Sequence, residues 1–457
     1  MKTRSVNLIA IATLLTLLIS PGSILPYRPS SPIGAVAASA AAASVAAAAH
    51  PAHRGVAAPS VADFVQPDGT LDLPIGFAGS LDPAGYQLIS VPDEAPRFVP
   101  FDQGDEYWAD GFGSPGMNDR VSALAVDAAG NLYAGGGFTT AGGVSANYIA
   151  KWNGTNWSPL GSGMNNHVYA LEVNAAGNLF AGGIFYRAGG VSANHIAKWN
   201  GTAWSPLGSG MDSLLYALAV NSAGYLFAGG YFTTAGGVNA NHIAKWNGSI
   251  WSPIGSGMNS SVIALAADAA GNVYAAGGFT TAGGVSANHI AKWNGTTWSP
   301  LGSGTNYPVH ALAVDAAGNL YAGGYFTTAG GVGANDIAKW NGTIWSPLGN
   351  GMNGQVLALA VDAAGNVYAG GDFTTAGGVS ANRIAKWNGT AWSRLGSGMN
   401  QRVSALAFDT AGNLYVGGIF TTAGGKPSAY IALWTGGVVK HSSFVPFVLT
   451  HYSTLAP

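Results

Sequence analysis

The stretch "IAKWNGTTWSPLG" (residues 290–302) carries two tryptophans five positions apart, one on either side of an Asn-Gly pair. Nearly the same sequence begins at residues 196, 243, 337 and 384. The second tryptophan of the pair recurs every 47 residues, at positions 157, 204, 251, 298, 345 and 392. A fixed period of roughly 20 to 50 residues is typical of solenoids, propellers and arrays. The repeat therefore narrows the fold class before any single residue is considered.

Each repeat contains four short apolar runs, which we predict to be β-strands. In the first copy they cover residues 121–127, 132–136, 148–152 and 156–160. The first run alternates apolar and small residues with the period of a strand. Asn153-Gly154 predicts a type I′ hairpin between the third and fourth strands. Pro159 cannot donate to a ladder, which puts the fourth strand at the edge of a four-stranded antiparallel sheet.

Such a sheet has two apolar faces and needs a neighbour on each side. A ring of these sheets is a β-propeller, and an open stack is the alternative. The 14 tryptophans form six pairs and leave Trp108 and Trp434 single, one before the first repeat and one at the end of the last. Pairing these two would close the ring and remove its exposed strand edges. We therefore predict an all-β, seven-bladed β-propeller of 47-residue repeats over residues 105–436, whose last blade is completed by an N-terminal outer strand around Trp108.

The segments outside the repeats predict an exported chain. Residues 1–26 contain Lys2, Arg4 and a short apolar run, as in a signal peptide, and the run is too short to cross a bilayer. We interpret residues 27–60 as an Ala/Pro-rich linker, 61–104 as a small N-terminal extension or cap, and 437–457 as a C-terminal tail. The predicted location is secreted or cell-surface, with no transmembrane span after signal removal.

Composition excludes some classes of partner and cofactor. Charged residues make up 8% of the chain and the net charge is −2, so no broad basic face is available for nucleic acid. The chain has no cysteine, which excludes disulfides and any cysteine-dependent cofactor chemistry. We expect no nucleic-acid partner, no cofactor and a monomeric protein.

The repeat resembles that of kelch-type propellers. The resemblance lies in "NLYAGG" (residues 319–324) and "KWNGTIWSPLG" (residues 339–349), which supply an apolar run, a glycine pair and two spaced aromatic residues. It covers about residues 107–436. The chain departs from the kelch pattern because its first aromatic residue is Trp rather than Tyr and the spacing is one residue shorter. The resemblance implies a propeller that serves as a binding platform or, less often, as an enzyme.

Candidate binding residues come from the longer loops. If the strands of each sheet are named A to D, the D–A and B–C loops share one face of the ring, which we call the loop face. The A–B and C–D turns are shorter, so the loop face is the natural binding surface. The copies differ there, and the candidate ligand-binding residues are Tyr231, His195, His242, His289, Tyr325, Asp336, Asp372 and Arg383. The D–A loops add Arg120, His167, Leu214, Tyr307, Gln355 and Arg402.

These positions support three more specific predictions. Asp372 and Arg383 flank one B–C loop, and we predict a cross-strand ion pair between them, with Tyr325–Asp336 and Tyr231–His242 as the same pairing in other blades. His195, His242 and His289 recur at one position, but adjacent blades would hold them too far apart for one metal ion, so we predict no metal site. The repeated Asp127, Asp268, Asp315, Asp362 and Asp409 head "DxAGN" turns and are predicted to cap them.

Three functions remain open from the sequence. The leading hypothesis is a non-enzymatic exported propeller whose loop face binds a carbohydrate or a surface protein. The first alternative is a carbohydrate-active hydrolase or lyase that uses Asp336 and Asp372, which lie in neighbouring blades. The second alternative is an architectural or adhesive surface protein with no discrete site.

Overall fold

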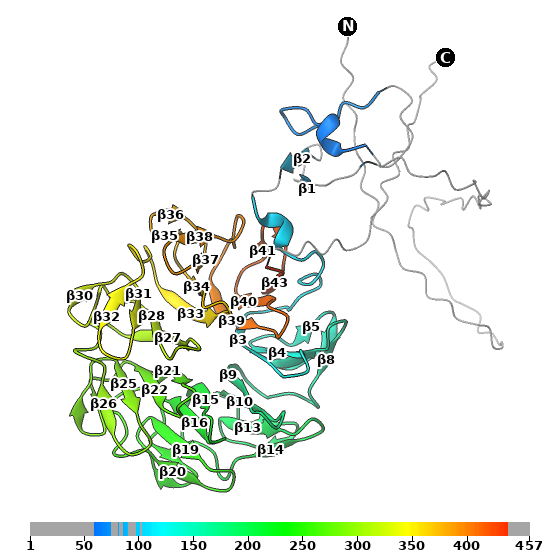
Figure 1. The fold of residues 1–457 in the computed structure, drawn as a ribbon. Coiled ribbons are helices and arrows are strands. Elements are labelled where there is room, and N and C mark those ends of the chain that lie inside the picture. Colours follow the sequence, from blue (N-terminus) through cyan, green and yellow to red (C-terminus); the bar gives the residue numbers. More distant parts are fainter. Residues whose placement is uncertain (1–58, 75–80, 82–85, 90–96, 101–102, 437–457) are drawn as a thin grey trace, which may run out of the picture. The chain divides into compact units, whose positions relative to one another are not determined.

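The computed structural model describes residues 59–74, 81, 86–89, 97–100 and 103–436 (Figure 1). The chain forms two units, one of residues 1–100 and 445–457 and one of residues 101–444. In the first, Ser60 caps the 3-10 helix η1 (Val61–Asp63), and β1 (Tyr86–Ile89) pairs with β2 (Arg97–Pro100) in an antiparallel ladder. The predicted signal peptide, the C-terminal tail and nearly all of the predicted linker lie outside the described residues. No helix among the described residues has the length and apolar character needed to span a bilayer.

The second unit is a ring of seven antiparallel sheets, as predicted (Figure 1). Strand A is the innermost of each blade, and neighbouring A strands lie against one another around the whole ring. The A strands are β3 (Val121–Val126), β9 (Val168–Val173), β15 (Leu215–Val220), β21 (Val262–Ala267), β27 (Val309–Val314), β33 (Val356–Val361) and β39 (Val403–Phe408). The B strands are β4 (Leu132–Gly136), β10 (Leu179–Gly183), β16 (Leu226–Gly230), β22 (Val273–Gly277), β28 (Leu320–Gly324), β34 (Val367–Gly371) and β40 (Leu414–Gly418).

The outer half of each blade carries the paired tryptophans. The C strands are β7 (Ile149–Trp152), β13 (Ile196–Trp199), β19 (Ile243–Trp246), β25 (Ile290–Trp293), β31 (Ile337–Trp340), β37 (Ile384–Trp387) and β43 (Ile431–Trp434). The D strands are β8 (Trp157–Pro159), β14 (Trp204–Pro206), β20 (Trp251–Pro253), β26 (Trp298–Pro300), β32 (Trp345–Pro347) and β38 (Trp392–Arg394). In blade 1, Trp152 on strand C faces Trp157 on strand D with ring centroids 5.5 Å apart.

Glycines at the end of strand B allow the blades to pack closely. A Cβ atom at Gly135 in blade 1 would lie 2.5 Å from Cγ1 of Val168 in blade 2, well inside van der Waals contact. Blade 4 has Ala276 at this position, fully buried. The first glycine of the pair is therefore a packing requirement between neighbouring sheets in most blades.

The ring closes through Trp108, as the unpaired tryptophans predicted. Trp108 forms an antiparallel bridge to Trp434, and the two ring centroids are 4.9 Å apart. The backbone N–H of Ala109 donates to the carbonyl of Leu433, and that of Thr435 donates to the carbonyl of Tyr107. The 3-10 helix η2 (Asp105–Tyr107) precedes this bridge. Blade 7 is thus a three-stranded sheet completed by a segment from the other end of the repeats.

The turn between strands C and D differs from the prediction. The Asn-Gly turn of blade 1 has a positive φ at Gly154 (98°) but not at Asn153, so it is not type I′. The Asn153 side chain instead accepts the backbone N–H groups of Thr155 and Asn156, and glycine alone takes the left-handed position. The predicted capping of the A–B turns is confirmed, because Oδ1 of Asp127 accepts the N–H groups of Ala129 and Asn131.

The B–C loop contains a small β-hairpin that we did not predict. These hairpins are β5 (Thr140–Ala141) with β6 (Val144–Ser145), β11 (Arg187–Ala188) with β12 (Val191–Ser192), β17 (Thr234–Ala235) with β18 (Val238–Asn239), β23 (Thr281–Ala282) with β24 (Val285–Ser286), β29 (Thr328–Ala329) with β30 (Val332–Gly333), β35 (Thr375–Ala376) with β36 (Val379–Ser380), and β41 (Thr422–Ala423) with β42 (Lys426–Pro427). A residue of the D–A loop, such as Met117, bridges to each hairpin. The two loops of the loop face are therefore tied together in every blade.

Candidate functional site

The residue that ends each B–C loop has an unusual backbone conformation. In all seven blades its φ lies between 62° and 67°, although none of the seven is glycine; they are Tyr148, His195, His242, His289, Asp336, Arg383 and Tyr430. This left-handed region is disfavoured for residues with a Cβ, with Asp and His less penalised than most. In blade 2 the imidazole Nδ1 of His195 lies 3.2 Å from the carbonyl oxygen of Gly183, at the end of strand B. His289 makes the same contact with Gly277 in blade 4.

The three predicted histidines therefore stay in their own blades. His195 and His289 turn back to a strand-B carbonyl, and the ring of His242 lies 5.8 Å from that of Tyr231 in blade 3. The predicted facing of Tyr231 and His242 is confirmed by this contact. No three His, Cys, Asp or Glu side chains come together as metal ligands within the described ranges.

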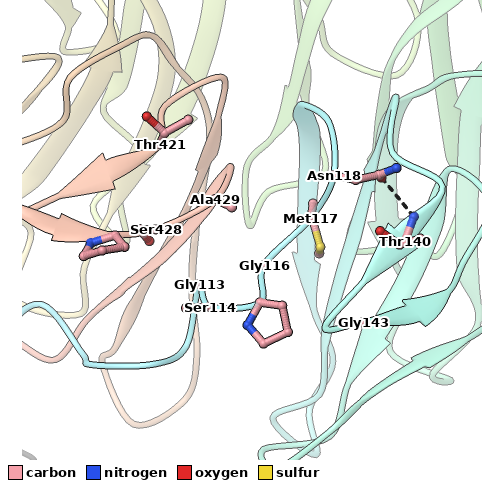
Figure 2. Close-up of a pocket in the computed structure, with 12 residues that line it drawn as sticks. Gly113, Ser114, Gly116, Met117, Asn118, Thr140, Gly143, Thr421, Ser428 and Ala429 are labelled. Atoms are coloured by element: carbon pink, nitrogen blue, oxygen red, sulfur yellow. Dashed lines mark hydrogen bonds between the residues drawn. The ribbon is translucent and has the colours of Figure 1, made fainter. Parts of the chain in front are cut away.

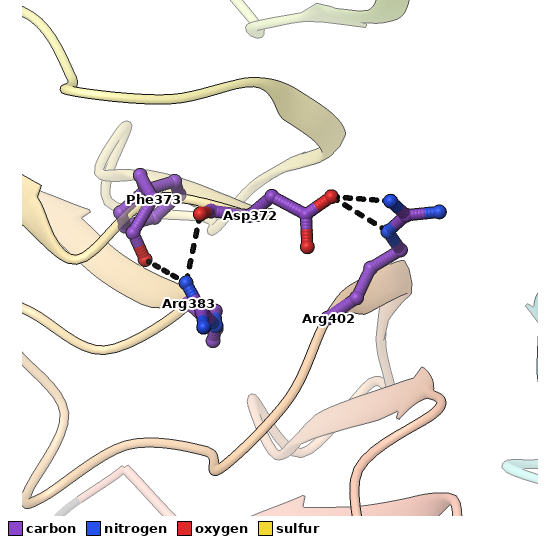
Figure 3. A network of polar contacts seen from close by, with 4 residues as sticks. All are labelled: Asp372, Phe373, Arg383 and Arg402. Atoms are coloured by element: carbon purple, nitrogen blue, oxygen red, sulfur yellow. Dashed lines mark hydrogen bonds and ion pairs between the residues drawn. The ribbon is translucent and has the colours of Figure 1, made fainter.

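The predicted ion pair between Asp372 and Arg383 is wrong (Figure 3). Nη1 of Arg383 donates instead to the backbone carbonyl of Asp372, at 2.8 Å. The Asp372 carboxylate binds the guanidinium of Arg402 in the next blade, with Nε 2.7 Å and Nη2 2.5 Å from Oδ2. The left-handed φ at Arg383 (66°) accompanies this turn of the side chain toward the backbone, and Asp372 is left to pair across the blade junction.

The carboxyl group of Asp336 is buried and forms no ion pair within the described ranges. The residue is 8% exposed, and burial raises the pKa of its carboxyl to about 6. Tyr325, predicted to face Asp336, has its ring 6.1 Å from that of Tyr307 in the D–A loop of the same blade. The two carboxylates proposed for hydrolysis thus have very different surroundings.

Exposed tyrosines gather on the loop face. Tyr186, Tyr231, Tyr307 and Tyr325 are between 51% and 58% exposed, and all belong to B–C or D–A loops. Tyr186 was missed by the sequence analysis, which compared only the residues that flank the loops. It stands where the other six copies have threonine, so a column-by-column alignment of the repeats would have found it.

Two further tyrosines were also missed because they lie on strand A, and Glu172 on the same strand was counted among the few carboxylates of the propeller without being given a role. Tyr169 and Tyr216 take the second position of β9 and β15, and their rings are 6.0 Å apart. Glu172 takes the fifth position of β9, where every other blade has alanine. Its Oε1 accepts the backbone N–H of Val220 from blade 3 at 3.3 Å, and burial raises the pKa of its carboxyl to about 7.

A cavity of about 300 Å³ lies where blade 7 meets blade 1 (Figure 2). The segment Gly113–Asn118 forms one wall, Thr140 and Gly143 of blade 1 another, and Thr421 with Pro427–Ala429 of blade 7 a third. The side chain of Asn118 accepts the backbone N–H of Thr140 at its edge, at 2.9 Å. The lining carries no charged side chain, so the cavity offers no acid, base or anchoring ion for chemistry.

The comparisons with known proteins show the fold alone. No protein-family model matches the chain, and no curated protein does. Among solved structures, the extracellular domain of a putative hybrid two-component system from B. thetaiotaomicron is 13% identical, with a TM-score of 0.50 over 78% of this chain and 44% of that one. The extracellular domain of a putative one-component system from the same organism is 12% identical, with a TM-score of 0.47 over 77% of this chain and 40% of that one.

The WD40 repeats of RRP9 match with 12% identity and a TM-score of 0.49, over 78% of this chain and 98% of that one. The chain spans less than half the length of the two extracellular domains. At these identities neither the kelch resemblance nor any other family is established for the chain. The sheet topology of the described residues shows that the chain is an all-β, seven-bladed β-propeller.

Proposed function

We propose that this chain is an exported, non-enzymatic propeller whose loop face binds a ligand, with carbohydrate as the leading ligand class and a surface protein as the other. The observation that carries the proposal is the set of exposed tyrosines on that face, Tyr186, Tyr231, Tyr307 and Tyr325. An exposed phenol ring offers a flat apolar face for the C–H side of a sugar ring and a hydroxyl for its polar edge. The kelch-type resemblance, in which propellers serve as binding platforms, agrees with this function.

The distribution of these rings favours a discrete site over a sevenfold one. The backbone repeats seven times, yet Tyr231 and Tyr325 occupy a position where the other blades have Gly, Ile or Asp. Tyr307 adds a second ring beside Tyr325 from the D–A loop of the same blade. The backbone is the same in every blade, but the side chains on the loop face differ. Each sector of the loop face therefore presents a different set of side chains. A ligand can therefore bind in one place and one orientation.

A glycan array with the full-length chain tests this function. We expect binding to a limited set of glycans, and at least a tenfold loss of signal in the double variant Tyr231→Ala/Tyr325→Ala. Tyr225→Ala is the matched control, because Tyr225 is also exposed (38%) but lies in an A–B turn on the opposite face. Absence of glycan binding, or equal loss in the control, would count against the proposal.

A hydrolase or lyase is the second candidate, and the Asp336 carboxyl is the observation in its favour. A buried carboxyl with a pKa of about 6 has the properties of a general acid. The proposed partner, Asp372, forms an ion pair with Arg402 of the next blade. A screen for sugar release should detect none, and Asp336→Asn should leave glycan binding unchanged. Release that disappears in Asp336→Asn would favour the enzyme instead.

The third candidate is an architectural or adhesive role, which the repeated part of the face would serve. Val144, Val191, Val238, Val285, Val332 and Val379 are all about 40% exposed at the same hairpin position. A sevenfold adhesive surface would depend on such repeated residues rather than on the tyrosines. The glycan array separates the two, since an adhesive role predicts no loss in the double tyrosine variant.

A further inference from the structure

Aromatic rings follow one another over blades 1 to 3 on the loop face. The rings of Tyr148 and His167 are 5.5 Å apart, those of His167 and Tyr169 are 6.2 Å apart, and those of Tyr169 and Tyr216 are 6.0 Å apart. At the strand-A position of Tyr169 and Tyr216, the remaining blades have Ser122, Ile263, His310, Leu357 and Ser404. We call the four residues Tyr148, His167, Tyr169 and Tyr216 the aromatic arc. It exists in one sector of the ring.

An arginine contacts the histidine of this arc and determines which ring nitrogen of the histidine accepts a hydrogen bond. Nη2 of Arg120 is 3.1 Å from Nδ1 of His167, across the junction of blades 1 and 2. A guanidinium can only donate, so Nδ1 is the acceptor and the proton of the neutral ring is on Nε2. Burial, followed by the charge of Arg120, holds the pKa of His167 below its usual value. The contact with Arg120 thus assigns Nδ1 as the acceptor and Nε2 as the donor of the neutral ring.

Blade 1 makes room for this histidine by having no side chain of its own at that place. A Cβ at Gly137 would lie 2.9 Å from Cε1 of His167 and 3.0 Å from Oδ2 of Asp119. Blade 4 also has a glycine at this position, Gly278, and the remaining blades have Ile184, Tyr231, Tyr325, Asp372 and Ile419. In blade 1 the glycine leaves the space beside which the His167 ring packs.

Arg120 keeps its charge available, unlike the equivalent arginine of the neighbouring blade. Arg402 precedes strand A of blade 7 as Arg120 precedes that of blade 1, and its charge is matched by the Asp372 carboxylate. The partner of Arg120 is a neutral imidazole. The adjacent Asp119 carboxylate binds the backbone N–H of Arg120, at 2.6 Å. Within the part of the chain that the structure describes, the exposed guanidinium of Arg120 forms no ion pair.

We propose that Arg120 and the aromatic arc form the subsite for a carboxylate-bearing sugar, a uronic acid residue of an acidic polysaccharide. This inference rests on the proposed carbohydrate-binding function and names the class of carbohydrate. The guanidinium presents several N–H donors in the planar geometry that binds a carboxylate through two parallel hydrogen bonds. The phenol rings of Tyr148 and Tyr169, which neighbour the His167 ring, offer apolar faces to the sugar ring. The Nε2–H of His167 lies between them as a donor to a hydroxyl.

Titration of the full-length chain with two matched trisaccharides tests the inference: a galacturonic acid trisaccharide and its neutral galactose counterpart. We expect the acidic probe to bind at least tenfold more tightly at low salt, with the preference shrinking as salt is added. Arg120→Gln should remove the preference, because the guanidinium that binds the carboxylate is lost. Arg187→Gln is the control, because Arg187 is an exposed arginine of the blade 2 hairpin outside the arc.

Tyr169→Ala should weaken binding of both trisaccharides. Its unfolding temperature, compared with that of the parent chain, shows whether the variant still folds. Arg120→Gln keeps the measurement independent of that risk, because Arg120 is exposed. Equal affinity for the two probes, or an unchanged preference in Arg120→Gln, would overturn the acidic subsite while the proposed function stands. Failure of every glycan on the array would overturn the proposed function itself.

Discussion

Six blades of this propeller are each built from one continuous stretch of chain, whereas blade 7 is assembled from two distant ones. In five of the six continuous blades the outer indole donates its Nε1–H to a backbone carbonyl of the preceding repeat, as Trp204 does to Leu160 at 2.9 Å. Trp108 makes the same bond to Leu395, at 3.2 Å, although nearly 290 residues separate them. The assembled blade therefore reproduces the contacts of a continuous one.

The junction between blades 7 and 1 is where the regularity ends. The segment from Trp108 to Met117 is two residues longer than the segment from Trp157 to Met164. Phe112 occupies the core there, with its ring 5.2 Å from Trp152 and 5.6 Å from Tyr415. The Nε1–H of Trp157 is buried and has no acceptor among the described residues. The shared strand thus closes the ring, and one donor on strand D of blade 1 is left unsatisfied within the described part of the chain.

Removal of the Trp108 indole, which closes the ring, should cause the largest loss of stability. Trp108 is 1% exposed, and Trp108→Ala should lower the free energy of unfolding by about 3–5 kcal/mol, as expected for a buried aromatic truncated to alanine. Trp251→Ala removes the equivalent indole of a continuous blade. The outer segment of blade 7 is not joined to strand C by a short turn, as the outer strand of a continuous blade is. In Trp108→Ala this segment should therefore detach more easily, and trypsin should cut faster at Arg120, which follows it in the chain. Thermal unfolding and limited proteolysis measure both, and equal protection of Arg120 in the two variants would contradict the difference between blades.

The second largest effect should be a pH dependence of stability that arises at the junction of blades 2 and 3. Glu172 is buried between blades 2 and 3, and burial raises the pKa of its carboxyl from 4.5 to about 7. A carboxyl with a raised pKa stabilises the fold below its unfolded pKa, and this contribution is lost as the pH rises through the folded value. Roughly 3 kcal/mol should be lost between about pH 4.5 and 7.

Glu172→Gln keeps an oxygen for the N–H of Val220 but cannot ionise. Urea unfolding at pH 5 and pH 8 should therefore show a smaller pH dependence in Glu172→Gln than in the parent chain, with the variant the more stable at pH 8. Replacement of Glu172 by alanine, the residue of the other six blades, is the second control. An unchanged pH dependence in both variants would show that Glu172 is not ionised on unfolding in this range.

The smallest effect isolates one hydrogen bond. Trp204→Phe removes a bonded Nε1–H, whereas Trp157→Phe removes one that has no acceptor. Both lose similar ring volume, so Trp204→Phe should cost about 1 kcal/mol more than Trp157→Phe, the usual net value of one hydrogen bond. Urea unfolding of the two variants provides the difference. Equal losses would mean that the Trp157 donor is satisfied in solution.

The sequence predicts the features that the period controls and fails for those that depend on neighbouring blades. Trp108 and Trp434 could be paired because the indoles follow a strict count along the chain. The Asp127 turn could be predicted because its contacts are local. The partner of Asp372 could not, because the nearest charge in the hairpin is Arg383, and only the ring brings Arg402 closer.

The aromatic arc shows the same limit in the candidate site. Tyr169 and Tyr216 are 47 residues apart, and nothing in either repeat alone indicates that they meet. Glu172 was counted among the carboxylates, but its burial was not predicted. The alanines at the same position in the other six blades indicate that this position is buried. Columns of the repeat alignment that vary on strand A would have identified all three residues, because that strand faces its own equivalents around the ring.

The indole-to-carbonyl bond between repeats has a consequence for how this molecule can change. Its acceptor is a main-chain oxygen, as in the bond from Trp251 to Leu207, so the bond does not depend on which side chains the preceding copy carries. A duplicated, shuffled or transplanted unit would meet its new neighbour with the same attachment already in place. Recognition can then diversify by exchange of whole units along the gene, while the framework that holds them stays intact.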